Sequence, residues 1–465
     1  MPSGRDDSSG APPPERKSRK ELANEQRLLA LGDAVDQQGG VRHRRKGRRR
    51  RVGRWVAISA VVIVVVIAGV VGGGYFYANY RFNKIPKVVV KGEAPPPPIS
   101  GQPFNILMIG SDSRAGLSGL LYRQTGANSG TVQGQRSDVV KIIHVDPDAG
   151  TISMVSIPRD TMVTLLANQS LYGQFNRINV NFGNGPSLLA QTITANFGIP
   201  IQQTIVVSFA GLINAADALG GVYLDFPYPS WDPNSGLRIL HPGCQLIQGF
   251  QALAVTRSRH FYYNVDHAKV FPDLNDSYDE LYNLGWISDG TSDFGRIDRQ
   301  DDFLRAMVDQ AKKLYNPLTL NSFLSKLPQG VTLDQNFTLR ELIGLAVRYH
   351  GINPNAIATY TLPVEAVNNT SLGDVLFVWQ PYAQEQLVDI FGHQLEKPSN
   401  PPPDSAMQSV APPFVAVPTT TSTTTTTVPA HKKKHPGTTT SATTTTTTNP
   451  TLVQPNFDPR PCSPS

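Results

Sequence analysis

The sequence has little cysteine and lacks the common catalytic motifs. Only Cys244 and Cys462 occur among its 465 residues, which is too few for a disulfide-rich scaffold. It has no glycine-rich loop followed by Lys-Ser or Lys-Thr, no His-Glu-x-x-His motif and no Gly-x-Ser-x-Gly motif. These absences argue against a P-loop nucleotidase, a zinc protease of the common type and a serine hydrolase.

Long apolar stretches are also missing, with one exception at residues 55–76. This stretch carries no charge and is about as long as a helix that crosses the roughly 30 Å of bilayer hydrocarbon. A block of seven basic residues at 44–51 precedes it, and such blocks stay in the cytoplasm. We therefore predict a single-pass protein of the cell membrane with a cytoplasmic N-terminus and an extracytoplasmic domain. The anchor is expected to be uncleaved because it begins far from the N-terminus.

A general excess of positive charge is absent outside the cytoplasmic arm. The formal charge of +6 comes from 42 basic and 36 acidic residues, but residues 1–80 hold 15 of the basic and 7 of the acidic ones. The remainder has 27 basic and 29 acidic residues, or −2. No nucleic-acid partner is predicted, because the folded part lacks a general basic surface. The basic arm suits the membrane and its anionic head groups.

Composition divides the chain into five regions. We predict a disordered basic arm at residues 1–54, a membrane helix at 55–78, a Pro-rich spacer at 79–103, one folded domain at 104–395 and a disordered Pro/Thr-rich tail at 396–465. Cys244 lies in the folded domain and Cys462 in the tail. They either form a disulfide, which an exported location permits, or remain two free thiols.

The folded region alternates strand-like and helical patterns. Strands are expected at residues 104–109, 139–145, 151–157, 204–209 and 222–226, and helices at 186–197, 210–219, 250–255, 299–315, 319–326 and 339–349. This alternation predicts an α/β layered fold. The Asp-Pro-Asp-Ala-Gly turn at 146–150 predicts a hairpin, so the central sheet should be mixed.

Two aspartates follow or begin predicted strands. Asp112 comes after the first strand and Asp138 begins the second. Two carboxylates at strand edges can share one Mg²⁺ ion, whose remaining ligands are water and phosphate oxygens. The alternative is that Asp112 caps a turn and Asp138 only starts a strand.

Several arginines lie at positions suited to phosphate. Arg159 closes a predicted strand and is expected to point into a crevice, although it could instead pair with Asp160. Arg257 and Arg259 face the same side if their segment is extended. Arg296 and Gln300 are four residues apart near a helix N-terminus, which favours anions, or they lie on a solvated helix face. Guanidinium forks match phosphate oxygens, so the set predicts a polyanionic substrate.

Two apolar helices carry a further prediction. Residues 187–197 and 209–219 are richer in Leu, Ile, Ala and Phe than one solvated layer requires. They either line a slot for a lipid chain or pack against the sheet as ordinary core.

Five ordered segments resemble the LytR-CpsA-Psr family. They are Gly-Ser-Asp-Ser-Arg at 110–114, Arg-Ser-Asp at 136–138, Ile-Pro-Arg-Asp at 157–160, Arg-Ser-Arg-His at 257–260 and Asp-Phe-Gly-Arg-Ile-Asp-Arg-Gln at 293–300. The resemblance covers about residues 105–315. It implies a three-layer α-β-α sandwich with a lipid-holding pocket. The implied activity is transfer of a glycopolymer from a polyprenyl-pyrophosphate carrier to peptidoglycan.

The same resemblance assigns roles to individual residues. Asp112 and Asp138 would hold Mg²⁺ (or Mn²⁺), and the pyrophosphate would be held by Arg159, Arg257, Arg259, Arg296 and Gln300. Second-rank substrate contacts are Arg114, Arg136, Arg177 and Asn179. Residues 180–184 depart from the family pattern, and Asp160 is a guess for the general base.

The function expected from the residues and the resemblance is a membrane-anchored phosphotransferase. Energy for the reaction would arrive with the lipid pyrophosphate, so no separate nucleophile is needed. The alternatives are a hydrolase of lipid pyrophosphate and a non-catalytic anchor that binds or regulates wall polymer. The arm and the Thr-rich tail resemble actinobacterial members, and residues 261–286 are expected to form a lid or a specificity loop.

Overall fold

The computed structural model describes residues 19–37, 44–95, 101–114, 117, 136–266, 270–273, 278–403 and 457–463. It divides into two compact units, residues 1–77 and 78–465. In the described part of the first unit, α1 (Arg19–Gln37) and α2 (Arg44–Phe82) are helical, and α2 continues into the second unit. The segment Ile58–Phe82 is long and apolar enough to cross a membrane, with a mean hydropathy of 2.4. Its valines are exposed, for example Val70 at 70%, which suits a lipid environment.

Residues 1–54, predicted as a disordered arm, include two helical segments among the residues that the structure describes. Residues 19–37 form α1, which is rich in the good helix formers Ala, Leu, Glu and Arg. The arginine block is also helical, because α2 begins at Arg44 and runs without interruption into the apolar stretch.

A seven-stranded sheet forms the centre of the second unit. Its order is β1 (Lys87–Val88), β14 (Val331–Asp334), β7 (Gln203–Ser208), β2 (Phe104–Ser111), β3 (Ser137–Asp146), β4 (Thr151–Ser156) and β15 (Ala358–Thr361). β2 is parallel to β7 and antiparallel to β3, and β3 and β4 form the predicted hairpin. The expectation of a mixed sheet is therefore confirmed.

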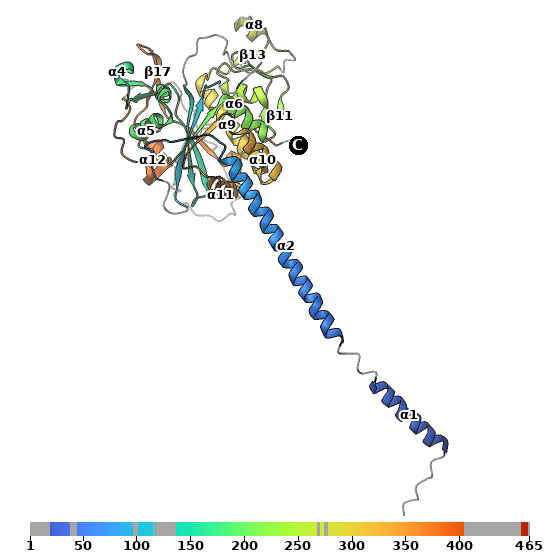
Figure 1. Ribbon diagram of the computed structural model, residues 1–465. Helices are drawn as coiled ribbons and strands as arrows, with labels where there is room; N and C mark the ends of the chain where they lie inside the picture. Colours follow the sequence, from blue (N-terminus) through green and yellow to red (C-terminus); the bar gives the residue numbers. More distant parts are fainter. Residues whose placement is uncertain are drawn as a thin grey trace, which may run out of the picture. The chain divides into compact units, whose positions relative to one another are not determined.

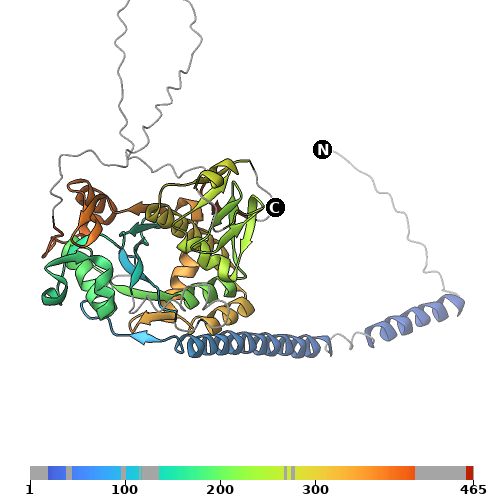
Figure 2. The same cartoon turned by 90° about the horizontal axis from the view of Figure 1, so that it is seen from above.

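Helices cover both faces of this sheet, as Figures 1 and 2 show. On one side lie α5 (Pro186–Phe197) and α12 (Tyr382–Phe391), and on the other lie α6 (Phe209–Ala218), α9 (Asp293–Ala311), α10 (Pro317–Lys326) and α11 (Leu339–Tyr349). Side chains alternate along β2, so Leu107 and Ile109 pack with α5 and α12, whereas Ile106 packs with α10 and α11. The three-layer α-β-α sandwich is confirmed.

Smaller elements surround the sandwich. Within the described ranges, the further helices are α4 (Gln169–Tyr172), α7 (Gly249–Arg257), α8 (Tyr278–Asn283) and the 3-10 helices η3 (Ile178–Asn184), η4 (Lys312–Tyr315), η5 (Pro354–Ala356) and η6 (Gly392–Gln394). One minor sheet joins β10 (Leu237–Ile239), β9 (Ser230–Asp232), β12 (Tyr262–Asn264) and β13 (Trp286–Ser288). A second minor sheet joins β11 (Gly243–Ile247), β8 (Val222–Phe226) and β18 (Arg460–Pro461). Two further sheets have two strands each: β5 (Met162–Thr164) pairs with β6 (Phe175–Arg177), and β16 (Val364–Thr370) pairs with β17 (Gly373–Val378).

The predicted spacer at residues 79–103 is largely part of the domain. Phe82 and Ile85 are each only 1% exposed and pack in the cluster that contains Leu333. β1 extends the central sheet beside β14. Burial of these apolar side chains stabilises the packing of the segment on the domain. The segment is therefore not a solvated spacer over this part. Three prolines of the run at 95–98, Pro96, Pro97 and Pro98, lie outside the described residues.

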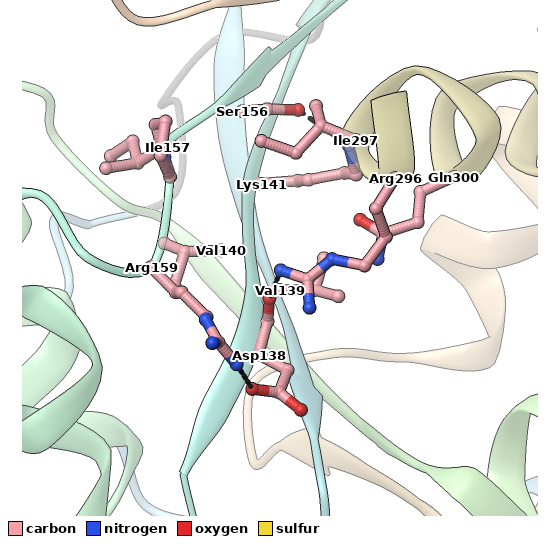
Figure 3. Close-up of a pocket in the computed structure, with 11 residues that line it drawn as sticks. Asp138, Val139, Val140, Lys141, Ser156, Ile157, Arg159, Arg296, Ile297 and Gln300 are labelled. Atoms are coloured by element: carbon pink, nitrogen blue, oxygen red, sulfur yellow. Dashed lines mark hydrogen bonds and ion pairs between the residues drawn. The ribbon is translucent and has the colours of Figure 1, made fainter. Parts of the chain in front are cut away.

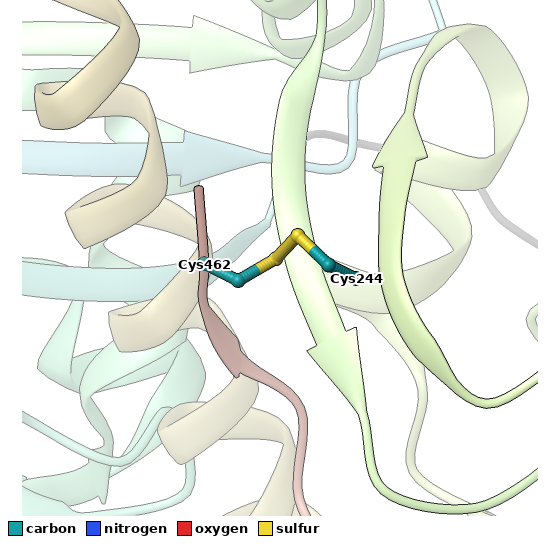
Figure 4. Close-up of a disulfide and its surroundings, with 2 residues drawn as sticks. All are labelled: Cys244 and Cys462. Atoms are coloured by element: carbon teal, nitrogen blue, oxygen red, sulfur yellow. A yellow bond between two sulfur atoms is a disulfide. The ribbon is translucent and has the colours of Figure 1, made fainter. Parts of the chain in front are cut away.

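The tail predicted as disordered at residues 396–465 packs on the domain at both of its described ends. Asn400 N donates to Ala195 O, and Thr164 Oγ1 donates to Pro401 O at 2.7 Å. At the far end, β18 pairs with β8, and Cys462 forms a disulfide with Cys244 (Figure 4). The threonine runs at 423–427 and 443–448 lie outside the described residues.

Glu93 gives the domain a testable pH dependence. Its Oε1 accepts a bond from Thr204 Oγ1 at 2.8 Å, and partial burial raises its pKa from 4.5 to about 7, with a further contribution from Asp334. The folded state therefore keeps a proton that the unfolded chain releases. The free energy of unfolding should fall as the pH rises from about 4.5 to about 7.

Replacing Glu93 with Gln should remove this part of the pH dependence. Urea denaturation of the full chain in detergent, repeated at several pH values, measures it for both proteins. Asp298, whose pKa burial also raises to about 7, contributes equally to both curves and cancels in the difference. Parallel curves for the two proteins would contradict the assignment.

Candidate functional site

An apolar cavity of about 320 Å³ lies between the central sheet and the helices α6, α9 and α10. Its apolar walls come from the sheet, the helices α6, α7, α9, α10 and α11 and the segments before β1 and α11. The apolar lining residues are Phe82, Ile85, Met108, Val139, Ile205, Val207, Phe209, Leu212, Ala215, Leu253, Phe303, Leu304, Met307, Phe323, Leu327, Val331, Leu333, Phe337 and Leu342. Polar and charged side chains also line it, namely Ser111, Asp138, Lys141, Ser208, Thr256, Arg257, Arg296 and Gln300.

Strand register places the charged side chains at one end of this cavity. Ser111 at the end of β2 pairs with Ser208 and with Ser137, which precedes Asp138. Leu333 pairs with Ile205, several residues back along the sheet, and Ile85 packs beside it. The cavity therefore runs from an apolar end near Ile85 to a charged end at the C-terminal ends of β2 and β7. We call this charged end the mouth.

The mouth collects residues from distant parts of the chain. Asp138 and Arg159, together with Arg296 and Gln300 from α9, line a small depression next to the cavity (Figure 3). Gln300 Nε2 donates to Thr256 O at 2.9 Å, which ties α9 to α7. The structure thus brings together the predicted Asp138, Arg159, Arg296 and Gln300.

Arg159 lies within a group of carboxylates. Its Nη1 is 2.7 Å from Asp138 Oδ1, and its Nε is 3.3 Å from Asp160 Oδ2. Burial opposes the charged form, but the carboxylates of Asp138, Asp160 and Asp293 outweigh it and raise the pKa of Arg159. The guanidinium therefore keeps its charge at the mouth.

Arg257 and Arg296 each have one buried nitrogen that finds no hydrogen-bond partner in the ranges that the structure describes. Arg296 is 4% exposed, and its Nη2 donates to Asp138 O at 3.1 Å and to Asp293 Oδ2 at 3.0 Å. Arg257 lies over the ring of Phe209 at 4.9 Å. Burial lowers the pKa of both, and the charge of Arg114 lowers that of Arg257 further. Arg257 Nη1 and Arg296 Nε bond to nothing among the residues that the structure describes, so an anion would satisfy them.

Arg257 and Arg259 do not share one extended segment, so the condition under which both would face the same side is not met. Arg257 is the last residue of α7, which extends two residues beyond the predicted helix. The backbone turns at Ser258, and Arg259 Nε lies 2.7 Å from Asp293 Oδ1. Arg257 therefore lines the cavity, whereas Arg259 pairs with the first turn of α9.

The second-rank candidates lie around the mouth. Arg177 bonds Leu372 O and Asp374 O, and its Nε is 3.4 Å from Asp160 Oδ1, so it joins the β16–β17 hairpin to Asp160. The backbone N of Asn179 donates to Arg159 O at 3.2 Å. The charge of Arg114 acts on Arg257, and the backbone N of Arg136 donates to Asp112 Oδ1 at 2.9 Å.

Asp112 and Asp138 remain a candidate cation pair. Asp112 is 9% exposed, and burial raises its pKa, with the nearby charge of Asp138 adding to the effect. Asp112 Oδ1 accepts the bond from Arg136 N, and Asp138 Oδ1 accepts the bond from Arg159 Nη1, so the Oδ2 atom of each carboxylate lies outside these bonds. Two neighbouring carboxylates of this kind fit a divalent cation. Among the described residues, no group of three or more His, Cys, Asp or Glu side chains could hold a metal.

Two residues that support the mouth, Asp232 and Lys141, are not among the predicted site residues. Asp232 is fully buried, and its Oδ2 accepts bonds from Ser258 Oγ, Arg259 N and His260 N at 2.7, 2.9 and 2.9 Å. Lys141 is 1% exposed and bonds Ser156 Oγ and Asp301 Oδ1, each at 2.6 Å. A lone lysine in an apolar strand was a usable signal, whereas Asp232 lies on a three-residue strand with no clear pattern.

Only one of the two apolar helices lines the cavity. Phe209, Leu212 and Ala215 of α6 are on its wall. The apolar face of α5 packs against the opposite side of the sheet, where Leu189 and Ile193 are fully buried. The slot interpretation therefore fails for α5, whose side chains are ordinary core.

Comparison with known proteins gives a consistent result. A model of the LytR_cpsA_psr family matches residues 81–270 and 287–390, which is more than half of the chain. A similar protein is the probable cell wall biosynthesis protein LcpB of Corynebacterium glutamicum, which is 29% identical over 287 residues, or 61% of this chain and 59% of that protein.

Other relatives agree with this match. The polyisoprenyl-teichoic acid–peptidoglycan teichoic acid transferase TagV of Bacillus subtilis is 26% identical over 266 residues, or 56% of each protein. The chain thus spans less than two thirds of the length of these relatives. Among solved structures, the LytR-Csp2A-Psr enzyme from Actinomyces oris is 18% identical, with a TM-score of 0.49, and the match covers 69% of this chain and 99% of that one.

Proposed function

The chain belongs to the LytR-CpsA-Psr family, and from this membership and the cavity we propose that it is a glycopolymer phosphotransferase of cell-wall assembly. In this proposal a glycopolymer passes from a polyprenyl-pyrophosphate carrier to a sugar hydroxyl of peptidoglycan. Relatives named as transferases of teichoic acid to peptidoglycan support it.

One observation carries the proposal. An apolar cavity of about 320 Å³ ends at the buried Arg296 and the half-buried Arg257, and each has a buried nitrogen with no hydrogen-bond partner among the described residues. A polyprenyl pyrophosphate has the matching chemistry, since it joins a long apolar chain to a compact anion. The polyprenyl chain of this ligand would lie along α6 and α10, and its diphosphate would bind Arg257 and Arg296.

The proposed step is a displacement at phosphorus. The acceptor hydroxyl oxygen attacks the phosphorus that carries the glycopolymer, and the bond from this phosphorus to the bridging oxygen breaks. The products are a phosphodiester between glycopolymer and acceptor, polyprenyl phosphate and a proton that passes to solvent. Arg159, Arg257 and Arg296 would stabilise the charge on the phosphate oxygens as the bond breaks.

Asp160 is a poor choice for the general base. Its Oδ2 faces Arg159 Nε and its Oδ1 faces Arg177 Nε. Asp160 instead holds both guanidinium groups in place. We propose that Asp112 and Asp138 hold Mg²⁺ or Mn²⁺, which when bound would neutralise phosphate charge.

We also propose that the catalytic domain is extracytoplasmic and anchored by α2. The apolar helical segment Ile58–Phe82 and the preceding arginines support this orientation. The Cys244–Cys462 disulfide is also typical of an oxidising compartment.

A transfer assay tests the proposal. The full chain in detergent would receive a synthetic polyprenyl-pyrophosphate glycan and peptidoglycan, and the products would be separated by mass. Polymer–peptidoglycan conjugate is the expected product, and Asp138→Ala should lower its formation to background. Free polymer phosphate in the presence of acceptor would indicate a hydrolase instead, and donor binding without turnover would indicate a wall-polymer anchor. Normal transfer by Asp138→Ala would remove Asp138 from the site.

A further inference from the structure

The turn that aims Arg257 and Arg259 is held from two sides. Asp232 accepts three bonds from residues 258–260, as described above. From the opposite side, Arg299 Nη2 donates to the carbonyl oxygen of Ser258 at 3.1 Å. Ser258 lies between the two arginines, so Arg299 fixes the backbone from which both of them project.

Arg299 is a completely buried cation that needs anionic partners. Its Nη1 lies 2.9 Å from Asp289 Oδ2 and 2.7 Å from Asp458 Oδ1, and the side chains of all three residues are at most 1% exposed. The guanidinium also lies over the ring of Phe261 at 4.4 Å. A buried guanidinium without enough acceptors is strongly unfavourable, so both carboxylates determine where Arg299 lies.

Gly295 allows one of these carboxylates to approach α9. A Cβ at this position would lie 1.9 Å from Thr291 Oγ1 and 2.9 Å from Asp289 Oδ2. Any side chain here would displace the loop that carries Asp289. The Asp-Phe-Gly sequence at 293–295 therefore has a packing role beside Arg299.

The other carboxylate comes from the far end of the chain. Asp458 is 159 residues from Arg299 in sequence and belongs to the segment at 457–462, which we call the C-terminal clasp. Within the clasp, Phe457 stacks on Tyr263 with ring centres 4.7 Å apart, and β18 pairs with β8. Cys462 is bonded to Cys244 on β11. The disulfide adds a covalent link between the clasp and β11, and so holds Asp458 beside Arg299.

We propose that the C-terminal clasp is a positioning element of the phosphate site. Asp458 holds Arg299, Arg299 holds the Ser258 carbonyl, and the fixed turn aims Arg257 at the cavity and Arg259 at Asp293. Asp458 is therefore a positioning residue, and the disulfide makes its contribution depend on oxidation. This inference rests on the proposed binding of a diphosphate at the mouth.

The test compares Asp458→Asn with the wild-type full chain in detergent. Asn keeps the shape and one oxygen of the side chain but removes its charge. The affinity for inorganic pyrophosphate, measured by calorimetry, and kcat for transfer should each fall roughly 10- to 100-fold, because misplacement of a binding group by about 1 Å has effects of this size. Asp309→Asn, which removes a carboxylate of α9 that pairs with Lys312 on the surface, should change neither value.

A second comparison uses the disulfide. Treating the wild type with dithiothreitol should weaken pyrophosphate binding by a similar factor. The Cys244→Ser/Cys462→Ser double variant should bind as weakly as the reduced wild type and should not respond to the reagent. Circular dichroism establishes that each sample is folded, and the reduced wild type serves as the decisive sample if Asp458→Asn does not fold.

The outcomes separate this inference from the proposed function. If the wild type binds pyrophosphate but transfers no glycopolymer, the proposed function fails while the comparison of affinities still tests the clasp. If folded Asp458→Asn and the reduced wild type both bind pyrophosphate with wild-type affinity, the clasp has no positioning role.

Discussion

Replacing Arg296 with Ala is expected to lower the rate of transfer by about 10³-fold. Arg296 lies at the junction of the cavity and the depression beside Asp138, and its buried Nε has no hydrogen-bond partner in the described part of the chain. Its contribution should be largest in the transition state, when charge builds up on the phosphate oxygens. The value of kcat should therefore fall by a larger factor than KM rises. Steady-state kinetics with a lipid-linked donor measures both constants.

Two further variants sharpen this result. Arg296→Lys keeps the charge but loses the planar fork of donors, so its rate should lie between those of the wild type and Arg296→Ala. Arg340→Ala removes an exposed arginine of α11 and should leave the rate unchanged. A folded Arg296→Ala protein with a wild-type rate would exclude Arg296 from the site.

The second large effect is expected from filling the cavity. Ala215 is 6% exposed and lies on the cavity wall, on α6. In Ala215→Phe the ring would occupy space that a long isoprenoid chain needs, so turnover of a long-chain donor should fall at least about 100-fold. Overpacking costs roughly 1–3 kcal/mol of stability, which thermal unfolding would detect separately.

Donor length distinguishes a blocked cavity from a damaged protein. A donor with a single isoprene unit reaches only the mouth, so Ala215→Phe should use it at nearly the wild-type rate. Ala346→Phe adds the same ring to an exposed position of α11 and should leave both donors unaffected. Equal losses with the long and the short donor would argue against a lipid chain in the cavity.

The central sheet could be predicted because its signals are local. Each predicted strand from 104–109 to 204–209 corresponds to a strand of the sheet, with ends shifted by at most two residues. The strand predicted at 222–226 has the same bounds as β8, but it lies in a minor sheet. Composition identifies a strand, whereas its neighbours depend on contacts far along the chain.

The site was predictable where its residues follow strands of that sheet. Asp138 lies at the start of β3 and Arg159 follows the end of the neighbouring β4, so strand order brings them to the same edge of the sheet. The direction of Arg257 depended instead on where α7 ends, and helix ends are uncertain by a few residues in any pattern. Asp232 and Asp458 could not be predicted, because both act through contacts with residues far away in sequence. Asp232 lies on a strand of three residues, and Asp458 follows the Thr-rich segment.

The cavity could not be predicted, because the hydrophobic periodicity of a sequence does not show how much space the packed side chains leave between them. Both α5 and α6 are apolar, yet only α6 faces a space that its neighbours leave unfilled. The same apolar pattern is therefore compatible with a filled core and with a binding cavity.

The most direct test of the whole account is a structure of the full chain with a polyprenyl-pyrophosphate donor bound. The diphosphate should lie within hydrogen-bond distance of Arg257 and Arg296, and the isoprenoid chain should extend along the cavity toward Ile85 and Phe337. A donor bound elsewhere, with the cavity empty and these arginines without phosphate contacts, would contradict the proposed function.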